Sequence, residues 1–133
     1  MNPKDVVLSF WNAMRTNDFH AASDWLSEDF ECLWPQSSEL IIGRANFAAI
    51  NSNYPSHGPW TFTINSIIAE GSHVVTDVSV SDGVQTGRAI TFHLVDGTSI
   101  RRQTEFWPDR FDALAWRSMW VQRTPEAPEG SPP

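Results

Sequence analysis

The sequence predicts an α+β domain in which helices come first and antiparallel strands follow. Apolar residues recur at helical spacing in segments before residue 55, and from residue 60 the apolar residues alternate with polar ones. Two Asp-Gly pairs, at 82–83 and 96–97, separate the alternating runs at points where a hairpin turn needs positive φ. These observations together indicate helices packed on a four-stranded meander.

The chain has 133 residues, of which 41% are hydrophobic, and this is enough for one domain with one core. We expect that domain to occupy residues 1–123. The last ten residues, 124–133, read TPEAPEGSPP and hold four prolines and a glycine. Such a segment buries too little apolar surface to fold, so it predicts a disordered tail.

Composition and charge exclude several classes of protein. Sixteen acidic against nine basic residues give a net charge of −7, and this surface would repel a nucleic acid backbone. No apolar run approaches the roughly 20 residues that cross a bilayer, and the N-terminus lacks the apolar stretch of a secretory signal. We therefore expect a cytoplasmic protein that binds neither membrane nor nucleic acid.

Metals, nucleotide cofactors and disulfides are also not expected. The four histidines lack the spacing of metal ligands, and no Gly-rich phosphate-binding motif is present. Cys32 is the single cysteine, so it has no internal disulfide partner, and its place in a short alternating run predicts a buried structural residue.

Three helices are expected before residue 55. Asn2 is a capping residue and Pro3 suits the first helical position, and the inward stripe of this helix is Val7, Phe10, Trp11 and Met14. Asn17 and Asp18 restart the pattern for a shorter helix with Phe19, Ala22, Trp25 and Leu26. Gly43 opens the third helix, which carries Phe47, Ile50 and Tyr54 on one side and ends at Pro55.

The strands are expected in two places. Phe30, Cys32 and Trp34 form a short strand that Pro35 stops, and a polar loop follows from Gln36 to Glu39. The meander begins near Trp60 and continues through roughly 74–81, 84–95 and 98–107. Beyond it, Asp112 can cap a last helical stretch that bears Trp116, Met119 and Trp120.

This order of elements resembles the cone-shaped nuclear transport factor 2-like fold, also called the SnoaL-like or cystatin-like fold, over residues 3 to about 123. Three segments also resemble an uncharacterised bacterial branch of that superfamily, which includes polyketide cyclase-like proteins: 33–37 (LWPQS), 43–47 (GRANF) with 54–55 (YP), and 104–108 (TEFWP) with 115–117 (AWR). The resemblance implies a strongly curved, mixed but mainly antiparallel sheet around three N-terminal helices, with a pocket between them. Relatives use this pocket for isomerase, dehydratase, cyclase or epoxide hydrolase chemistry, or only for binding, so the fold alone does not fix the function.

Catalytic residues of the relatives are only partly matched. Relatives of the ketosteroid isomerase type have an aspartate where this chain has Trp34, and their acidic donor on the penultimate strand matches Thr91. Limonene-epoxide hydrolases combine an arginine and an aspartate, at positions that match Val78 and Val80, with an acid on the last strand that matches Glu105. The resemblance therefore leaves Glu105 as the carboxyl group in a catalytic position.

Glu105 and His93 are the candidate catalytic residues. A carboxyl group in an aromatic pocket has a raised pKa and can act as a general acid or base. The alternative for Glu105 is a salt bridge with Arg101 or Arg88 that ties the strands together. His93 shares its strand face with Thr91 and can supply a second titrating group, although Ile90, Phe92 and Leu94 form a more apolar opposite face that would turn His93 away from the core.

Aromatic residues are abundant, with seven Trp and eight Phe, which is more than a small core needs. The candidate ligand-binding residues are Trp11, Trp34, Tyr54, Arg101 and Trp107, and the alternative for the aromatic ones is plain core packing. Trp116 and Trp120 are expected to cap the pocket, to pack across the twofold axis of a homodimer or to cover the chain's own sheet. We favour the homodimer, because one small domain cannot easily bury this much aromatic area.

The sequence thus predicts a SnoaL-like protein that binds a small hydrophobic or aromatic molecule without a cofactor. Glu105 would supply acid or base chemistry of the isomerase, cyclase or hydrolase type. The alternative is a non-catalytic ligand-binding or dimerisation module.

Overall fold

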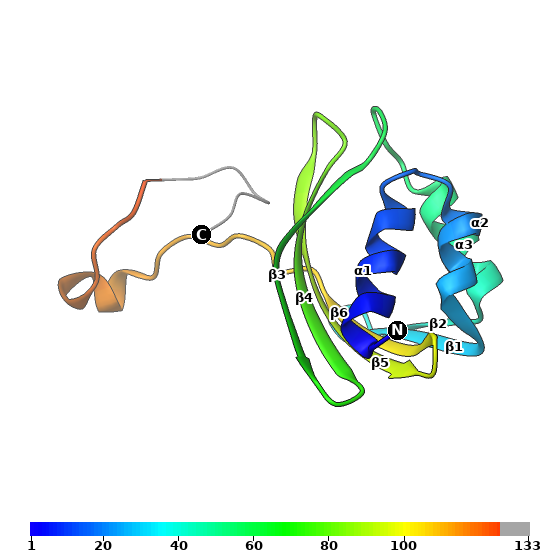
Figure 1. Cartoon of the computed structure of the whole chain (residues 1–133). Coiled ribbons are helices and arrows are strands. Elements are labelled where there is room, and N and C mark those ends of the chain that lie inside the picture. The colour runs from blue at the N-terminus through cyan, green and yellow to red at the C-terminus, as the bar shows by residue number, and fades with distance from the viewer. Residues whose placement is uncertain (126–133) are drawn as a thin grey trace.

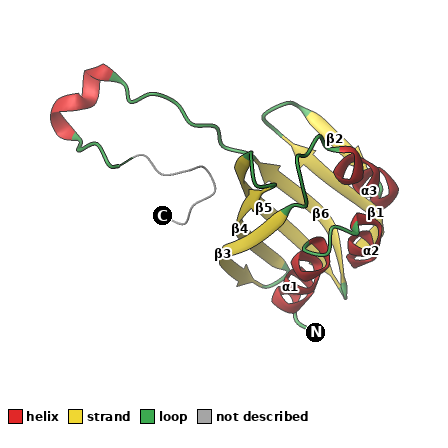
Figure 2. Cartoon of the chain, turned by 90° about the horizontal axis from the view of Figure 1, so that it is seen from above, coloured by secondary structure: helices red, strands yellow, loops and turns green. Residues whose placement is uncertain are grey.

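The computed structural model describes residues 1–125, in which a curved sheet of six strands wraps its concave face around three helices (Figure 1). Seen from above, the helices gather on one side of the sheet and leave its other side uncovered by helix (Figure 2). We call the side that faces the helices the inner face and the opposite side the outer face. This arrangement is the α+β cone that the sequence predicts.

The three helices form close to where the sequence predicts them, except that Leu26, expected on the second helix, already lies in the first strand. Helix α1 (Pro3–Met14) begins at Asn2, whose side chain accepts a hydrogen bond from the Asp5 backbone N–H at 2.9 Å. Helix α2 (Phe19–Ala22) is a single turn that continues into the 3₁₀ turn η1 (Ser23–Trp25), and α3 (Arg44–Asn53) follows Gly43. Helix α1 buries the apolar stripe of Val6, Val7, Phe10, Trp11 and Met14, whereas α3 buries Phe47 and leaves Tyr54 54% exposed at its end.

The sheet has the strand order β2-β1-β6-β5-β4-β3. Its strands are β1 (Leu26–Trp34), β2 (Glu39–Ile42), β3 (Thr61–Glu70), β4 (His73–Ser81), β5 (Thr86–Asp96) and β6 (Ser99–Phe106). Strands β3 to β6 form the expected antiparallel meander, β2 pairs antiparallel with β1, and β1 pairs parallel with β6. Gly83 (φ 93°) and Gly97 (φ 61°) supply the positive φ of the two predicted hairpin turns.

Strand β2 was not among the predicted elements. The residues expected as a polar loop make a tight turn instead, in which Ser38 has a φ of 59°. The chain then reverses, and Leu40 pairs with Leu33 at the edge of the sheet. A serine with positive φ is uncommon, so the turn type has no clear signal in the sequence.

A β-bulge in β6 decides which side chains face inward. Val95 pairs with Ile100 and Leu94 pairs with Arg102, so Arg101 is an additional residue without an opposite partner. This extra residue shifts the alternation by one position. Ile100 and Glu105, five residues apart, therefore both lie on the inner face and are buried.

After β6 the chain leaves the domain on the outer side of the sheet, away from the helices (Figure 1). We call residues 108–125 the C-terminal arm. It contains the 3₁₀ turn η2 (Ala115–Trp120), so the predicted helical stretch with Trp116, Met119 and Trp120 is present, but it begins at Ala115 without a side-chain cap and Asp112 does not cap it. Trp116, Met119 and Trp120 are 72%, 84% and 74% exposed, so they neither close the pocket nor cover the chain's own sheet.

Of the tail expected at 124–133, residues 126–133 lie outside the described part of the chain. Among residues 1–125, no helix is both long enough and apolar enough to cross a bilayer.

Phe30 is the aromatic residue that joins the first strand to α3. Its side chain is fully buried and meets Phe47 edge to face at 5.6 Å between ring centroids. We expect Phe30→Ala to lower the free energy of unfolding by about 3–5 kcal/mol, because the truncation leaves a cavity that the sheet and the helix cannot both close. Val84→Ala, in an exposed turn, should change it by about 0.5 kcal/mol or less. Urea unfolding measures both values, and equal losses would contradict this core assignment.

Candidate functional site

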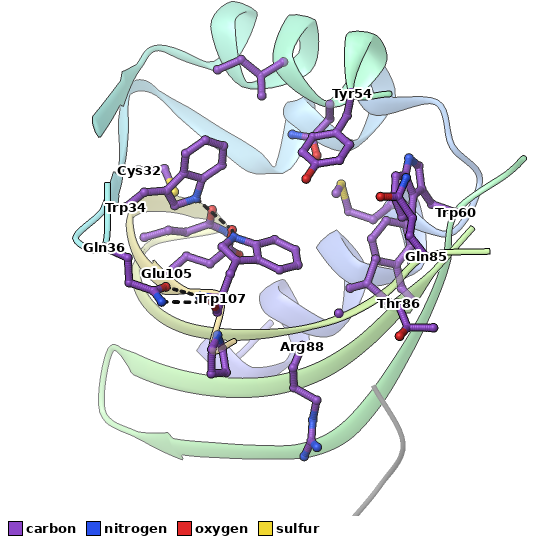
Figure 3. A pocket seen from close by; sticks show the side chains of 18 of the residues that line it. Cys32, Trp34, Gln36, Tyr54, Trp60, Gln85, Thr86, Arg88, Glu105 and Trp107 are labelled. Atoms are coloured by element: carbon purple, nitrogen blue, oxygen red, sulfur yellow. Dashed lines mark hydrogen bonds between the residues drawn. The ribbon is translucent and has the colours of Figure 1, made fainter. Parts of the chain in front are cut away.

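A cavity of about 660 Å³ lies between the helices and the inner face of the sheet (Figure 3). Its wall comes from α1, α3, the end of β1, β3 to β6 and the first residues of the C-terminal arm. Large apolar and aromatic side chains make up much of this wall, including Trp11, Trp34, Phe47, Tyr54, Trp60 and Trp107. Size and lining are those of a site for a small, mostly apolar molecule.

Glu105 is the buried carboxyl group in the wall of this cavity. Its side chain projects from β6 between the indoles of Trp34 and Trp107, and the residue is 8% exposed. Trp34 Nε1 and Trp107 Nε1 each donate a hydrogen bond to Oε1 at 3.1 Å, as Figure 3 shows. Thr91, opposite Glu105 on β5, donates its hydroxyl proton to Oε2 at 2.6 Å. The carboxyl group is therefore held by three donors from different parts of the chain.

Two opposing effects act on the pKa of Glu105. Burial raises this pKa, because the ionised form loses its water, whereas the hydrogen bonds from Thr91, Trp34 and Trp107 lower it by stabilising the anion. Burial prevails, so the pKa of Glu105 lies above its ordinary value of 4.5. A raised pKa lies closer to neutral pH, and a carboxyl group with such a pKa can both take up and release a proton.

The hydrogen bonds also determine where a proton can reside on Glu105. An indole N–H only donates, so Oε1 must remain an acceptor in both protonation states. A hydroxyl group can donate or accept, so Thr91 can turn its proton away when Oε2 is protonated. The proton of the neutral acid is thus assigned to Oε2.

The salt bridge expected as the alternative for Glu105 does not form. Arg88 pairs with Asp77, with its Nε 2.8 Å from Oδ1 and its terminal nitrogen 2.6 Å from Oδ2, and its guanidinium points away from the cavity (Figure 3). Arg101 is exposed at the bulge of β6 and lies outside the cavity wall. Its assignment to ligand binding is therefore corrected, since the additional residue of the bulge does not continue the inward alternation.

His93 lies on the inner face of β5 but behind the cavity wall. It is 1% exposed, and its Nε2 and Nδ1 lie 2.8 Å from the Thr76 hydroxyl and 3.2 Å from the Gln103 amide nitrogen. Burial lowers the pKa of His93 to about 3, so the ring is neutral at pH 7. His93 does not line the cavity, which corrects its assignment as a group that reacts with the ligand, and it supports Gln103, which does line it.

Strand β5 does not turn its more apolar face toward the core, which was the alternative that would have pointed His93 outward. Phe92, on the more apolar side of this strand, is 49% exposed on the outer face, while Thr91 and His93 point inward. Hydrogen bonds satisfy these two buried polar side chains, so burying them costs little. The apolar periodicity of this strand was thus a misleading signal.

Four of the five predicted ligand-binding residues do line the cavity: Trp11, Trp34, Tyr54 and Trp107. The sequence reasoning missed Trp60, Gln36 and Gln103. Gln103 could have been found, because it lies two residues before Glu105 and so shares its face. Gln36 had no such signal, and its amide nitrogen donates to the Trp107 carbonyl at 3.0 Å across 71 residues of chain.

The family model of the SnoaL-like domain matches residues 7–104, which is most of the chain. The chain therefore belongs to the SnoaL-like family. A comparison with curated proteins gave no match.

Solved structures with the same fold include several bacterial proteins. A Kribbella flavida protein provisionally assigned as a ketosteroid isomerase has 25% sequence identity and a TM-score of 0.84, over 96% of this chain and 93% of that chain. An NTF2-like protein of unknown function from Burkholderia xenovorans has 29% identity and a TM-score of 0.75, over 92% and 95%. An LEH-like epoxide hydrolase of M. tuberculosis, at 19% identity and a TM-score of 0.65 over 80% and 82%, shares the fold.

Thr91 offers a direct test of the balance at Glu105. We expect Thr91→Val to raise the pKa of Glu105 above that of the unmodified chain, because the variant loses the only donor that residues 1–125 provide to Oε2 and keeps the burial. The side-chain carboxyl ¹³C resonance of Glu105, followed by NMR against pH, measures both pKa values. Thr104→Val, one residue earlier on β6, is the matched control and should leave the pKa unchanged. A pKa of Glu105 at or below 4.5 in the unmodified chain would contradict the proposed balance.

Proposed function

We propose that this SnoaL-like protein binds a small, mostly apolar molecule in the cavity and that Glu105 transfers a proton to or from it. The observation that carries the proposal is a carboxyl group buried in an aromatic wall, with burial raising its pKa. An acid or base with a pKa closer to neutrality is what general acid–base catalysis uses. Isomerisation, cyclisation and hydration are reactions of this type.

The cavity wall would hold and orient the ligand. Trp34 and Trp107 flank Glu105, while Tyr54 and Trp60 meet edge to face at 5.6 Å on the other side of the cavity (Figure 3). A flat apolar ligand between these rings would displace water from around the carboxyl group. Loss of that water would strengthen the basicity of the carboxylate toward a proton on the ligand.

The proton itself would move to and from Oε2. As a base, ionised Glu105 would take a proton from the ligand, and the proton would remain on Oε2 while the Thr91 hydroxyl reorients. As an acid, the same group would return the proton at another atom of the ligand, and both the charge and the bonds of Glu105 would be restored. The two indole N–H groups would hold Oε1 in place throughout, so little reorganisation would be needed.

A second candidate function is binding without catalysis. Its support is that Glu105 already connects β1, β5 and β6 through three hydrogen bonds, which is also what a purely structural carboxyl group would do. In addition, Val78 and Val80 are buried apolar residues where epoxide hydrolases of this fold carry charged partners. The small-molecule partner and the cytoplasmic location both stay predictions.

Exchange of the α-protons of 2-tetralone in D₂O distinguishes the two functions. 2-Tetralone is a small, flat ketone whose α-proton a buried base can remove, and NMR follows its replacement by deuterium. We expect the unmodified chain to accelerate this exchange and Glu105→Gln to lose the acceleration by about a hundredfold or more, because the amide cannot accept the proton. Glu31→Gln, which removes an acid from β1 outside the cavity wall, is the matched control and should exchange at the unmodified rate.

The pH dependence gives an independent check. The ionised form is the base, so the exchange rate should rise with pH and level off above the pKa of Glu105, with a midpoint above 4.5. Binding of 2-tetralone without acceleration over Glu105→Gln would favour the binding module. Failure of 2-tetralone to perturb any resonance of the cavity residues would contradict a site for this class of ligand.

A further inference from the structure

The C-terminal arm carries large apolar side chains that its own domain does not cover. Six such residues lie within eleven positions and are between 48% and 84% exposed: Phe111, Leu114, Trp116, Met119, Trp120 and Val121. Leaving this much apolar area in water is unfavourable, and a contiguous set of this kind usually marks a contact with another molecule.

The outer face of the sheet holds a second uncovered apolar feature. The strand register places six residues in one line that crosses all six strands, and we call this line the outer-face row. It runs through Ile68, Val75, Phe92, Thr104, Leu33 and Leu40. Ile68 is 67%, Phe92 49%, Leu33 39% and Leu40 47% exposed, so the row is apolar along nearly its whole length and open to solvent.

We propose that the chain forms a homodimer by arm exchange, in which the C-terminal arm of each copy lies across the outer-face row of the other copy. The arm leaves the domain on the same side of the sheet that carries the row (Figures 1 and 2). It extends away from that sheet instead of folding back on it, as the exposure of Trp116 and Trp120 shows. A second copy is therefore the occupant that both features fit.

The dimensions of arm and row agree. Strands in a sheet lie about 4.8 Å apart, so a row across six strands is roughly 24 Å long. Residues 111–121 comprise extended chain and the 3₁₀ turn η2, with rises of about 3.3 Å and 2.0 Å per residue, and so span roughly 25–30 Å. One arm is thus long enough to cover one row.

Charge also favours this pairing. Residues 108–125 hold three arginines and two aspartates, a net charge of +1, whereas residues 1–107 hold twice as many acidic as basic side chains. A positively charged arm is therefore attracted to the negatively charged domain of another copy. The same attraction would not exist between two bare domains, which repel each other.

The buried area is sufficient for a stable dimer. A buried aromatic side chain removes about 150–250 Å² from water, and each arm presents Phe111, Trp116 and Trp120. Two reciprocal contacts, each with an arm and a row, would reach the roughly 1,200–2,000 Å² of a standard stable interface.

The Kribbella flavida structure matches 96% of this chain, so the match must include most of residues 108–125, which form the arm.

Sedimentation velocity of the full chain between about 1 and 100 μM tests the proposal. We expect the unmodified chain to be a dimer. An arm variant, Trp116→Ala with Trp120→Ala, and a row variant, Ile68→Ser with Phe92→Ser, should each weaken self-association by about tenfold or more, because each removes central aromatic contacts. Val84→Ser, which replaces a residue 71% exposed in a turn away from the row, is the control and should dimerise normally. Circular dichroism establishes that each variant is folded.

Mixing the two variants provides the decisive observation. The row variant keeps an intact arm and the arm variant keeps an intact row, so their mixture regains one arm-on-row contact that neither has alone. We expect a heterodimer in the mixture, seen as energy transfer between dye-labelled variants. A monomeric unmodified chain, normal dimerisation of the arm variant, or no heterodimer in the mixture would each overturn the proposal, and the second would point to direct packing of two outer faces.

Discussion

The buried carboxyl group of Glu105 holds the residues of the cavity wall in place on the sheet through three hydrogen bonds. Trp34 reaches it from the end of β1, Thr91 from the neighbouring strand β5, and Trp107 from just beyond β6. A buried carboxyl group without donors would cost several kcal/mol, so its three partners must stay in place for the fold to tolerate it. The hydrogen bonds that satisfy the buried carboxyl group also fix the indoles of Trp34 and Trp107 on either side of it, and so they shape that end of the cavity.

The same principle explains why this inner face combines tryptophan with polar residues. A tryptophan contributes a large apolar surface together with one N–H donor, so it can line a cavity and satisfy a buried acceptor behind it. Trp34 and Trp107 do this for Glu105, and Trp11 donates to the Thr76 hydroxyl at 3.3 Å. Thr76 in turn contacts the neutral ring of His93, so the buried polar groups form two small networks behind an aromatic wall.

The sequence was a good guide where local spacing decides the structure and a poor one where distant partners decide it. The stripe of α1, the ends of α3 and the two Asp-Gly turns follow from local rules, and the structure confirms each of them. The facing of β5 does not, because its inward residues Thr91 and His93 are polar and only their partners on other strands make burial tolerable. Likewise, no spacing rule joins Trp34 to Glu105 across 71 residues of chain.

The bulge at Arg101 shows how one additional residue changes the assignment of a site. Without it, strict alternation would place Ile100 and Glu105 on opposite faces, and one of them would point to solvent. With it, Arg101 takes the exposed position and Glu105 enters the cavity wall. The position of the candidate catalytic group thus depends on a local irregularity of β6 as much as on the fold.

The central claim is that ligand binding and the ionisation of Glu105 occur in the same place and affect each other. The most direct measurement is the pKa of Glu105 by carboxyl ¹³C NMR with and without a saturating concentration of naphthalene, a neutral apolar probe that has no group to titrate. We expect this pKa to rise further when the probe is bound, because the probe removes water from the charged form of the carboxyl group. Binding of naphthalene that leaves both the resonance and the pKa of Glu105 unchanged would contradict the account.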